Sequence, residues 1–100
     1  MQYRINYSKV ISQAESINDQ AEQLAAKISS LEQLEQECRS CWKGDAADAF
    51  TAKLSQLRSE MTGTKNQMKN LASTIRECAE RIRREDQEAE RRAAALSSGQ

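Results

Sequence analysis

Apolar residues recur at alternating steps of three and four positions, and this spacing constrains the fold more than any other feature. In the first half the series is Val10, Ala14, Ile17, Ala21, Leu24, Ile28 and Leu31. Such spacing places apolar side chains along one side of an α-helix, in the pattern of a coiled-coil seam. The 100 residues include no Pro and only 3 Gly, so helix breakers are scarce. We therefore expect an all-α fold.

The second half repeats the spacing with greater regularity. Its series is Ala47, Phe50, Leu54, Leu57, Met61, Thr64, Met68, Leu71, Ile75, Cys78 and Ile82. Beyond Ile82 the same positions are Glu85, Ala89, Arg92 and Leu96, so the apolar series is interrupted and packing is expected to end near Ile82. In the first half the phase shifts after Leu31, because the next apolar residues are Leu34 and Cys38. A local overwinding of the helix would accommodate this shift.

The helix ends can also be located. We expect one helix at about 7–42, a second at about 45–93, and a frayed tail at 94–100. Asn6 or Ser8 can cap the first helix, Gly44 can be its left-handed stop, and Asp45 can cap the second. Two long helices joined by so short a connection should lie antiparallel, so residues 1–100 form a single helical hairpin.

Gly63 is the one weak point within the second helix, because an interior glycine lowers helix stability by about 1 kcal/mol relative to alanine. A kink at Gly63, or a break that creates a third helix, is one alternative. The spacing of apolar residues passes through this position without losing phase, which favours a continuous helix.

The apolar stripes are broader than one neighbouring helix can cover. Further apolar residues flank the seams, namely Ile11, Ala25, Ala26, Ala46, Ala49, Ala52, Ala72 and Ala79. A second hairpin would cover them, which predicts a four-helix bundle formed by a homodimer or a heterodimer. The expected hairpin and partner interface comprises Ile17, Leu24, Ile28, Leu31, Leu34, Phe50, Leu54, Leu57, Met61, Met68, Leu71 and Ile75.

The composition argues against catalysis and against binding of nucleic acid or membrane insertion. The 15 basic and 15 acidic residues cancel, there is no His, and no apolar run is long enough for a membrane span. No nucleophile motif or phosphate-binding loop is present, so no catalytic residue, cofactor or metal is expected. The Arg-rich segment 81–96 interleaves its Arg with acids at a spacing of four, which is typical of a solvated helix.

The three cysteines are Cys38, Cys41 and Cys78. A zinc site needs four ligands, and in a hairpin Cys78 lies too far along the axis from Cys38 for a disulfide. We interpret Cys38 and Cys78 as small apolar seam residues and place Cys41 near the rim. An intermolecular link or metal site at the turn, or a redox-responsive switch, is the alternative.

Trp42, Gly44, Ala47 and Phe50 give the order Trp-x-Gly-x-x-Ala-x-x-Phe at the predicted turn. In a helical chain of this length, the motif resembles the WXG family of type VII secretion systems. The resemblance covers the whole chain and implies an exported or export-assisting protein that is usually a dimer. Such a protein folds in the cytoplasm and is then secreted or associated with the cell envelope, without a cleaved signal peptide. The resemblance also implies a recognition turn at Trp42, Lys43 and Gly44, which acts beside a partner's C-terminal tail on the secretion ATPase.

One departure from the family pattern affects the functional expectation. Members with their own export signal carry a Tyr followed four residues later by an acid after the second helix, whereas this chain has only Tyr3 and Tyr7. A partner would then supply the signal, or the chain would be a helper that binds the N-terminal helices of a larger LXG-type toxin. A cytosolic coiled-coil adaptor is the alternative from another class.

Overall fold

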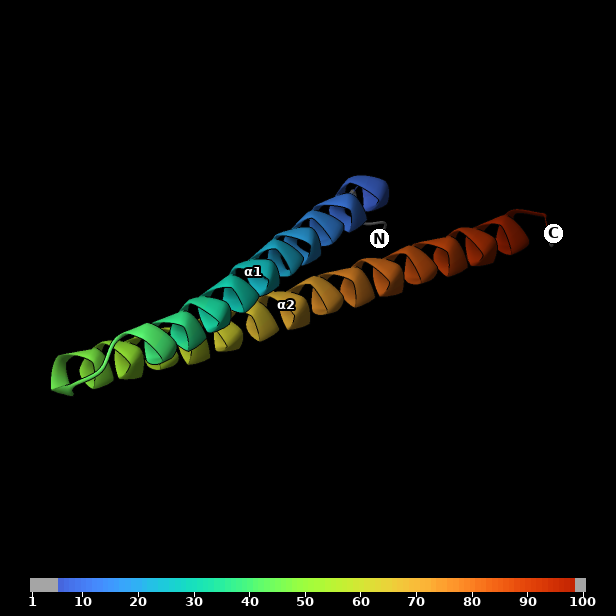
Figure 1. Ribbon diagram of the computed structural model, residues 1–100. Coiled ribbons are helices and arrows are strands. Elements are labelled where there is room, and N and C mark those ends of the chain that lie inside the picture. Colours follow the sequence, from blue (N-terminus) through green and yellow to red (C-terminus); the bar gives the residue numbers. More distant parts are fainter. Residues whose placement is uncertain (1–5, 99–100) are drawn as a thin grey trace.

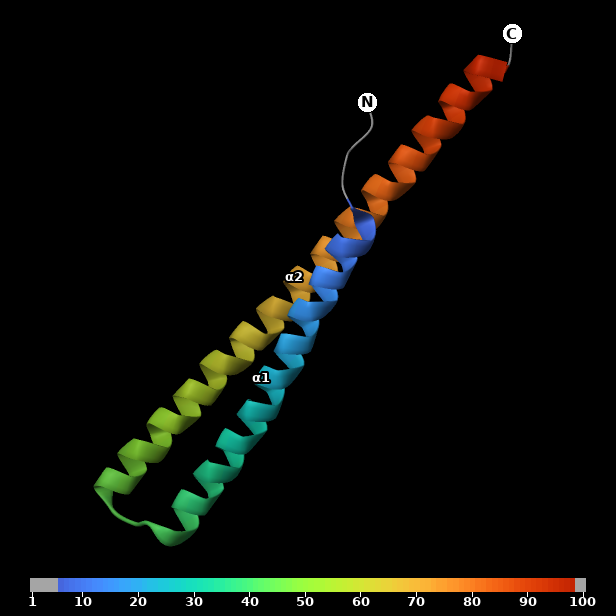
Figure 2. The same cartoon turned by 90° about the horizontal axis from the view of Figure 1, so that it is seen from above.

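A computed structural model describes residues 6–98, which form two antiparallel helices joined by a short turn (Figure 1). Helix α1 spans Tyr7–Cys41, and helix α2 spans Asp45–Ser98. The predicted all-α hairpin is confirmed. Because α2 is longer, it continues well past the start of α1, and the molecule is a rod with extents of 85 × 15 × 15 Å (Figure 2).

The helix boundaries differ from expectation mainly at the C-terminal end. Asn6 caps α1, because its side-chain Oδ1 accepts a hydrogen bond from the Lys9 amide at 3.1 Å. Helix α1 ends one residue earlier than predicted, and α2 is continuous through Gly63. The frayed tail predicted from residue 94 is wrong as far as 98, because the Ala93–Ala95 run favours the helix strongly. Residues 99 and 100 lie outside the described residues.

The seam of α1 keeps its spacing to the end of the helix, in contrast to the predicted phase shift. Ala14 and Ala21 are fully buried, and Leu31 is half-buried. The next core position is taken by Glu35, which is only 1% exposed, whereas Leu34 is exposed. The predicted overwinding is therefore wrong. A step of four from Leu31 to Glu35 keeps the helix regular, and a cation from α2 compensates for the buried charge.

That cation is Arg58. Its Nε donates a hydrogen bond of 2.6 Å to Oε2 of Glu35, and the Nη2 of Arg39 lies 3.5 Å from Oε1. The hydrogen bond to Glu35 raises the pKa of Arg58 above its usual value. A buried carboxylate is tolerated only when such partners replace its water. The pair therefore ties one position on α1 to one position on α2.

The seam of α2 faces α1 with a different set of residues from the predicted one. The buried residues are Ala47, Thr51, Ala72, Ala79 and Asp86. Leu54, Met61, Met68, Ile75 and Ile82 are half-buried, as the spacing indicates, but Phe50, Leu57, Thr64, Leu71 and Cys78 are exposed. For these five the predicted position in the helix–helix seam is wrong. In each case the next residue in the sequence faces α1 instead. Small side chains such as that of Ala72 let the two helices approach closely, and Arg58 contacts Glu35.

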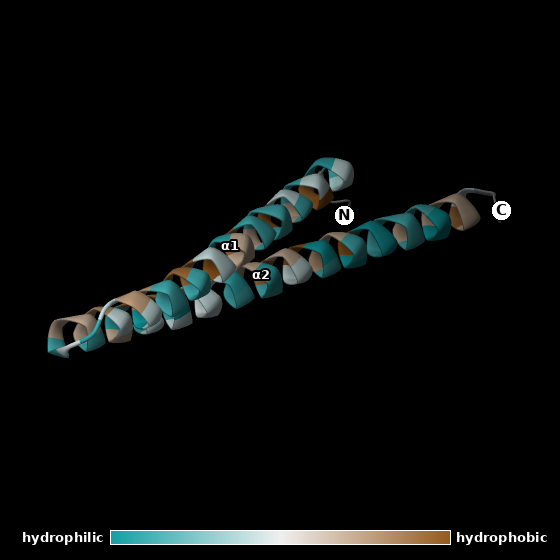
Figure 3. Ribbon diagram, in the orientation of Figure 1, coloured by the Kyte–Doolittle hydropathy of each residue, from teal (hydrophilic) through white to brown (hydrophobic). Residues whose placement is uncertain are grey.

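A second polar contact closes the open end of the hairpin, which is the end away from the turn. The Tyr7 hydroxyl donates a hydrogen bond to Oδ2 of Asp86, a residue that is only 6% exposed. Packing thus extends beyond Ile82, where it was predicted to end. The part of α2 beyond this contact is mostly hydrophilic (Figure 3), and it includes an ion pair between Arg92 and Glu88 at 3.7 Å.

The Glu35–Arg58 pair leads to a prediction about stability. Arg58→Ala leaves a buried carboxylate without its main partner and should lower the free energy of unfolding by about 1–3 kcal/mol. Glu35→Leu should raise the thermal midpoint, because leucine continues the apolar seam. Circular dichroism melting measures both, with the exposed Arg84→Ala as the control. A less stable Glu35→Leu protein would contradict this account.

The Tyr7–Asp86 contact predicts a dependence on alkaline pH. The hydrogen bond to Asp86, followed by burial and nearby negative charge, raises the pKa of Tyr7 from 10.0 to about 12. A raised pKa means that the contact stabilises the fold below pH 10.0 and is lost as the pH rises to about 12. In a Tyr3→Phe variant, tyrosinate absorbance should report this pKa, and Tyr7→Phe should remove the corresponding loss of thermal stability. Titration near pH 10.0 would contradict the prediction. Tyr3 itself lies outside the described residues.

Candidate protein-interaction site

The turn is formed by Trp42, Lys43 and Gly44, all of which lie outside the two helices. Trp42 ends α1 in an extended conformation, and its amide donates to the Cys38 carbonyl at 2.9 Å. Gly44 has a φ of 114°, and its carbonyl accepts the first hydrogen bond of α2, from the Asp48 amide at 3.0 Å. Gly44 therefore precedes α2 instead of stopping α1. Asp45 is the first helical residue and not the cap, because Gly44 occupies that position.

Trp42 packs against the first aromatic residue of α2. Its ring centroid lies 5.6 Å from that of Phe50, with the rings tilted by 53°. This is a favourable aromatic geometry, yet 44% of Trp42 remains exposed. The Nζ of Lys43 turns back to donate to the Arg39 carbonyl at 3.0 Å. The structure thus brings Trp42 to Phe50 and directs the Lys43 amine toward α1.

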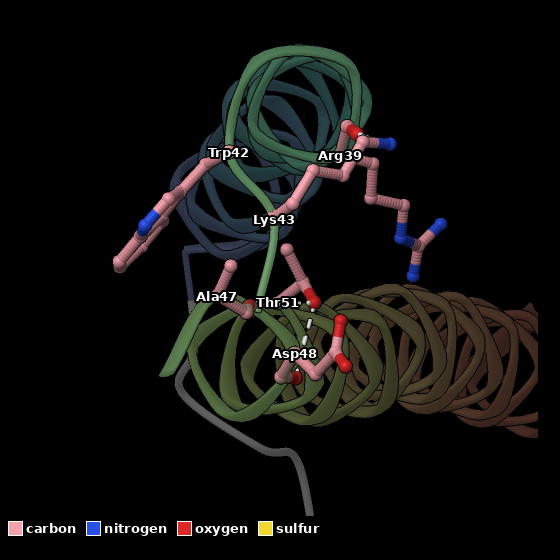
Figure 4. Close-up of a pocket in the computed structure, with 6 residues that line it drawn as sticks. All are labelled: Arg39, Trp42, Lys43, Ala47, Asp48 and Thr51. Carbon is pink, nitrogen blue, oxygen red and sulfur yellow. Dashed lines mark hydrogen bonds between the residues drawn. The ribbon is translucent and has the colours of Figure 1, made fainter. Parts of the chain in front are cut away.

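Figure 4 shows that Trp42 and Arg39 point to opposite sides of the hairpin tip. A shallow hollow of about 190 Å³ lies here, lined by Arg39, Trp42, Lys43, Ala47, Asp48 and Thr51. The hollow is smaller than ordinary small-molecule sites, which occupy about 300–1,000 Å³. The tip is therefore better suited to contact with another protein than to a bound metabolite.

The two sides of α2 differ sharply in character. The exposed apolar residues of α2 come one position before residues that face α1: Phe50 before Thr51, Leu57 before Arg58, and Leu71 before Ala72. Two cations come one position after half-buried residues: Lys69 after Met68, and Arg76 after Ile75. One residue turns a helix by about 100°, so these two groups lie on opposite sides of the seam. The first group is apolar and 43% to 52% exposed. The second group is cationic.

Ion pairs show which sides of the two helices form a common face. Lys69 pairs with Glu22 of α1, and Nη2 of Arg76 lies 3.7 Å from Oε1 of Glu15. The hydrogen bond from Lys69 lowers the pKa of Glu22. We call Glu15, Glu22, Lys69 and Arg76 the ion-paired face. Exposed pairs of this kind each contribute little to stability, but here they cover one side of the hairpin with charge.

The opposite face carries large apolar side chains. Leu34 precedes the buried Glu35 on α1, whereas Glu22 follows the buried Ala21, so Leu34 lies away from the ion pairs. Its companions on this side are Phe50, Leu57 and Leu71, together with Trp42 beside Phe50. We call these five residues the apolar face. Five large, half-exposed apolar side chains on one side of a hairpin are typical of an interaction surface.

The interface residues expected from the sequence therefore separate into two groups. Half-buried between or beside the helices are Ile17, Leu24, Ile28, Leu31, Leu54, Met61, Met68 and Ile75. Exposed on the apolar face are Leu34, Phe50, Leu57 and Leu71. The second group is the one that the hairpin itself leaves uncovered.

The three cysteines form no disulfide with one another. All three are free, with Cys38 half-buried and Cys41 and Cys78 exposed, so Cys78 is not the seam residue that was predicted. Over residues 6–98, no cluster of His, Cys, Asp or Glu is suited to hold a metal ion. Over the same range, neither helix is apolar enough along its length to cross a membrane.

The two described glycines provide a matched test of the turn. A Cβ added at Gly44 or Gly63 would meet nothing within 4 Å, so backbone conformation alone decides the effect. Gly44→Ala should destabilise the hairpin by about 1–3 kcal/mol, because a φ of 114° is unfavourable for alanine. Gly63→Ala should stabilise it by about 1 kcal/mol. Thermal unfolding measures both, and equal effects would show that the turn imposes no special conformation.

Comparison with known proteins gives one family match. The family model "WXG100: Proteins of 100 residues with WXG" matches residues 2–87. Among curated proteins and among solved structures, none matches the chain. The matched segment includes all of α1, the turn with Trp42 and Gly44, and most of α2. The chain therefore belongs to the WXG100 family of small helical proteins associated with type VII secretion.

Proposed function

We propose that this chain is an exported protein or an export partner that acts by packing its apolar face against another helical hairpin. The observation that carries the proposal is the contrast between the two faces. One face is covered by ion pairs, while the other exposes Leu34, Trp42, Phe50, Leu57 and Leu71. A four-helix bundle would bury the four side chains that lie on the helices, Leu34, Phe50, Leu57 and Leu71, and would leave Trp42 accessible at the tip, either as a homodimer or as a heterodimer with a related hairpin.

The second proposed contact is between the turn and the type VII secretion ATPase. Trp42 offers a rigid aromatic surface with one N–H donor, fixed by its packing on Phe50 and by the Gly44 conformation. A large aromatic side chain at an exposed tip is a suitable anchor for a partner protein. In this account the protein folds in the cytoplasm and leaves the cell, or reaches the cell envelope, without a cleaved signal peptide.

A second candidate is the targeting helper for a larger LXG-type toxin. It is favoured by residues 83–100, which contain no Tyr and so do not include the usual tyrosine-and-acid export signal. The apolar face would then receive the N-terminal helices of the toxin. This version predicts weak self-association and a stable complex after co-expression with those helices.

Replacement of Trp42 tests the proposed function. Trp42→Ala should abolish export, or delivery of the partner, in a host with a type VII system. Helicity and association should persist, because the side chain lies outside both helices. Trp42→Phe is the control and should retain export, since it keeps an aromatic ring at the tip. Secreted and cellular fractions, circular dichroism and light scattering are the measurements.

Two results would contradict the proposal. If Trp42→Ala unfolds the protein, the indole is a structural plug at the end of the hairpin. If the variant is exported as well as the native chain, or if no export occurs in either case, the cytosolic adaptor becomes the better account.

A further inference from the structure

Two of the three cysteines lie in the last turn of α1, directly before the turn of the hairpin. Cys38 is half-buried, Cys41 is exposed, and both thiols are free. Positions three apart on a helix are neighbours, and helical geometry places their Cα atoms about 5 Å apart. Disulfides span Cα separations of about 4.4–6.8 Å. Cys38 and Cys41 are therefore close enough to react with each other.

The third cysteine is too far away to react with either of them within one chain. Arg76 pairs with Glu15 across the hairpin, so Cys78 lies near the level of Glu15. Along α1, Glu15 and Cys38 are separated by about 23 residues, which corresponds to about 35 Å. All three cysteines lie within residues 6–98, and among them only Cys38 and Cys41 can form a disulfide within the chain.

A disulfide at this place would change the end of α1. Helical positions three apart have Cβ atoms about 5–6 Å apart, whereas a disulfide brings them to about 3.5–4.5 Å, so they must approach by about 1 Å or more. Cys41 is the last helical residue, and Trp42 after it is already extended. We expect the movement at Cys41, which carries the backbone of Trp42 with it.

The contacts that hold Trp42 depend on the same turn of α1. Its amide donates to the Cys38 carbonyl at 2.9 Å, and its ring centroid lies 5.6 Å from that of Phe50. Hydrogen bonds of this kind span only about 2.7–3.2 Å between donor and acceptor. A movement of about 1 Å at the neighbouring Cys41 is large on this scale. The state of the two thiols is therefore coupled to the position of the indole.

We propose that Cys38 and Cys41 form a reversible disulfide, and that this disulfide displaces Trp42 from Phe50. The structure holds the reduced form, which is the form that the cytoplasm maintains. A disulfide that is exposed, and that closes only after its Cβ atoms are drawn together, is readily reduced again. Formation of the disulfide after the chain leaves the cytoplasm rests on the proposed function, which includes export.

The reaction is an exchange with an oxidant that itself contains a disulfide. The Cys41 thiolate attacks one sulfur of the oxidant, which forms a mixed disulfide and releases one thiolate. The Cys38 thiolate then attacks Sγ of Cys41, forms the intrachain disulfide and releases the second thiolate. The two cysteines lose two protons and two electrons, and the oxidant leaves as two thiols. The roles follow accessibility, because Cys41 is exposed and Cys38 is half-buried.

Oxidised glutathione is the probe that tests the disulfide. In a Cys78→Ser variant it should remove both remaining thiols, with a mass loss of two hydrogen atoms, no attached glutathione and no covalent dimer. Dithiothreitol should restore both thiols. Cys38→Ser in the same background should keep one attached glutathione on Cys41, because no second thiol can displace it. Mass spectrometry and non-reducing electrophoresis are the measurements.

The matched control moves one cysteine by a single position. Ser40→Cys combined with Cys41→Ser, again with Cys78→Ser, keeps two cysteines in the last turn, but positions two apart do not face each other on a helix. This variant should retain attached glutathione. Trp42, the 1 Trp of the chain, reports the displacement by its fluorescence. Oxidation of the Cys78→Ser variant should shift the emission to longer wavelength, because the ring leaves Phe50 and becomes more exposed to water.

Each part of the proposal can fail separately. A stable glutathione adduct on Cys38 and Cys41, or a covalent dimer as the main product, would overturn the disulfide. An intrachain disulfide that leaves the Trp42 emission unchanged would overturn the displacement. In a host with a type VII system, secreted protein that still carries both thiols would overturn formation of the disulfide after export. Absence of export would instead count against the proposed function, while the measurements on purified protein would stand.

Discussion

One neighbouring helix cannot cover the whole of a broad apolar stripe. The structure depends on which part of the stripe of α2 is buried against α1 and which part is left exposed. Leu54, Met61, Met68 and Ile75 lie along its middle and are half-buried. To one side, small residues such as Ala72 contact α1, and to the other side the leucines face outward. The centre of the apolar stripe therefore lies at the boundary between the surface that contacts α1 and the surface that faces solvent. The exposed half is a consequence of two-helix geometry and gives the hairpin a surface for another protein.

Much of the fold could be predicted from the sequence, but the rotation of α2 could not. The three-four spacing predicts two helices, and Trp42 with Gly44 marks the turn between them. The same spacing is satisfied by Leu57 or by Arg58 as the residue that faces α1, because each continues a regular series. Hydropathy alone favours the leucine, whereas the fold uses the arginine. Direction around a helix is decided by the neighbouring helix, which a periodic pattern does not describe.

Glu35 illustrates the same difficulty on α1. An apolar pattern assigns the position to Leu34, since a carboxylate in a seam is costly. A step of four from Leu31 leads to Glu35, and a step of four from Leu54 leads to Arg58, which are opposite charges at matching levels of a hairpin. These opposite charges at matching levels were the feature of the sequence from which the buried ion pair could have been predicted. With Tyr7 and Asp86 at the other end, the two contacts fix the register, because sliding one helix would leave a buried carboxylate unpaired.

The dimensions of the rod have a consequence for the proposed export. With extents of 85 × 15 × 15 Å, the folded hairpin is several times longer than it is wide. A channel that accepts it lengthwise needs an opening matched to its width and not to its length. Passage end-on would therefore preserve every hydrogen bond of both helices, so that movement across a membrane need not begin with unfolding.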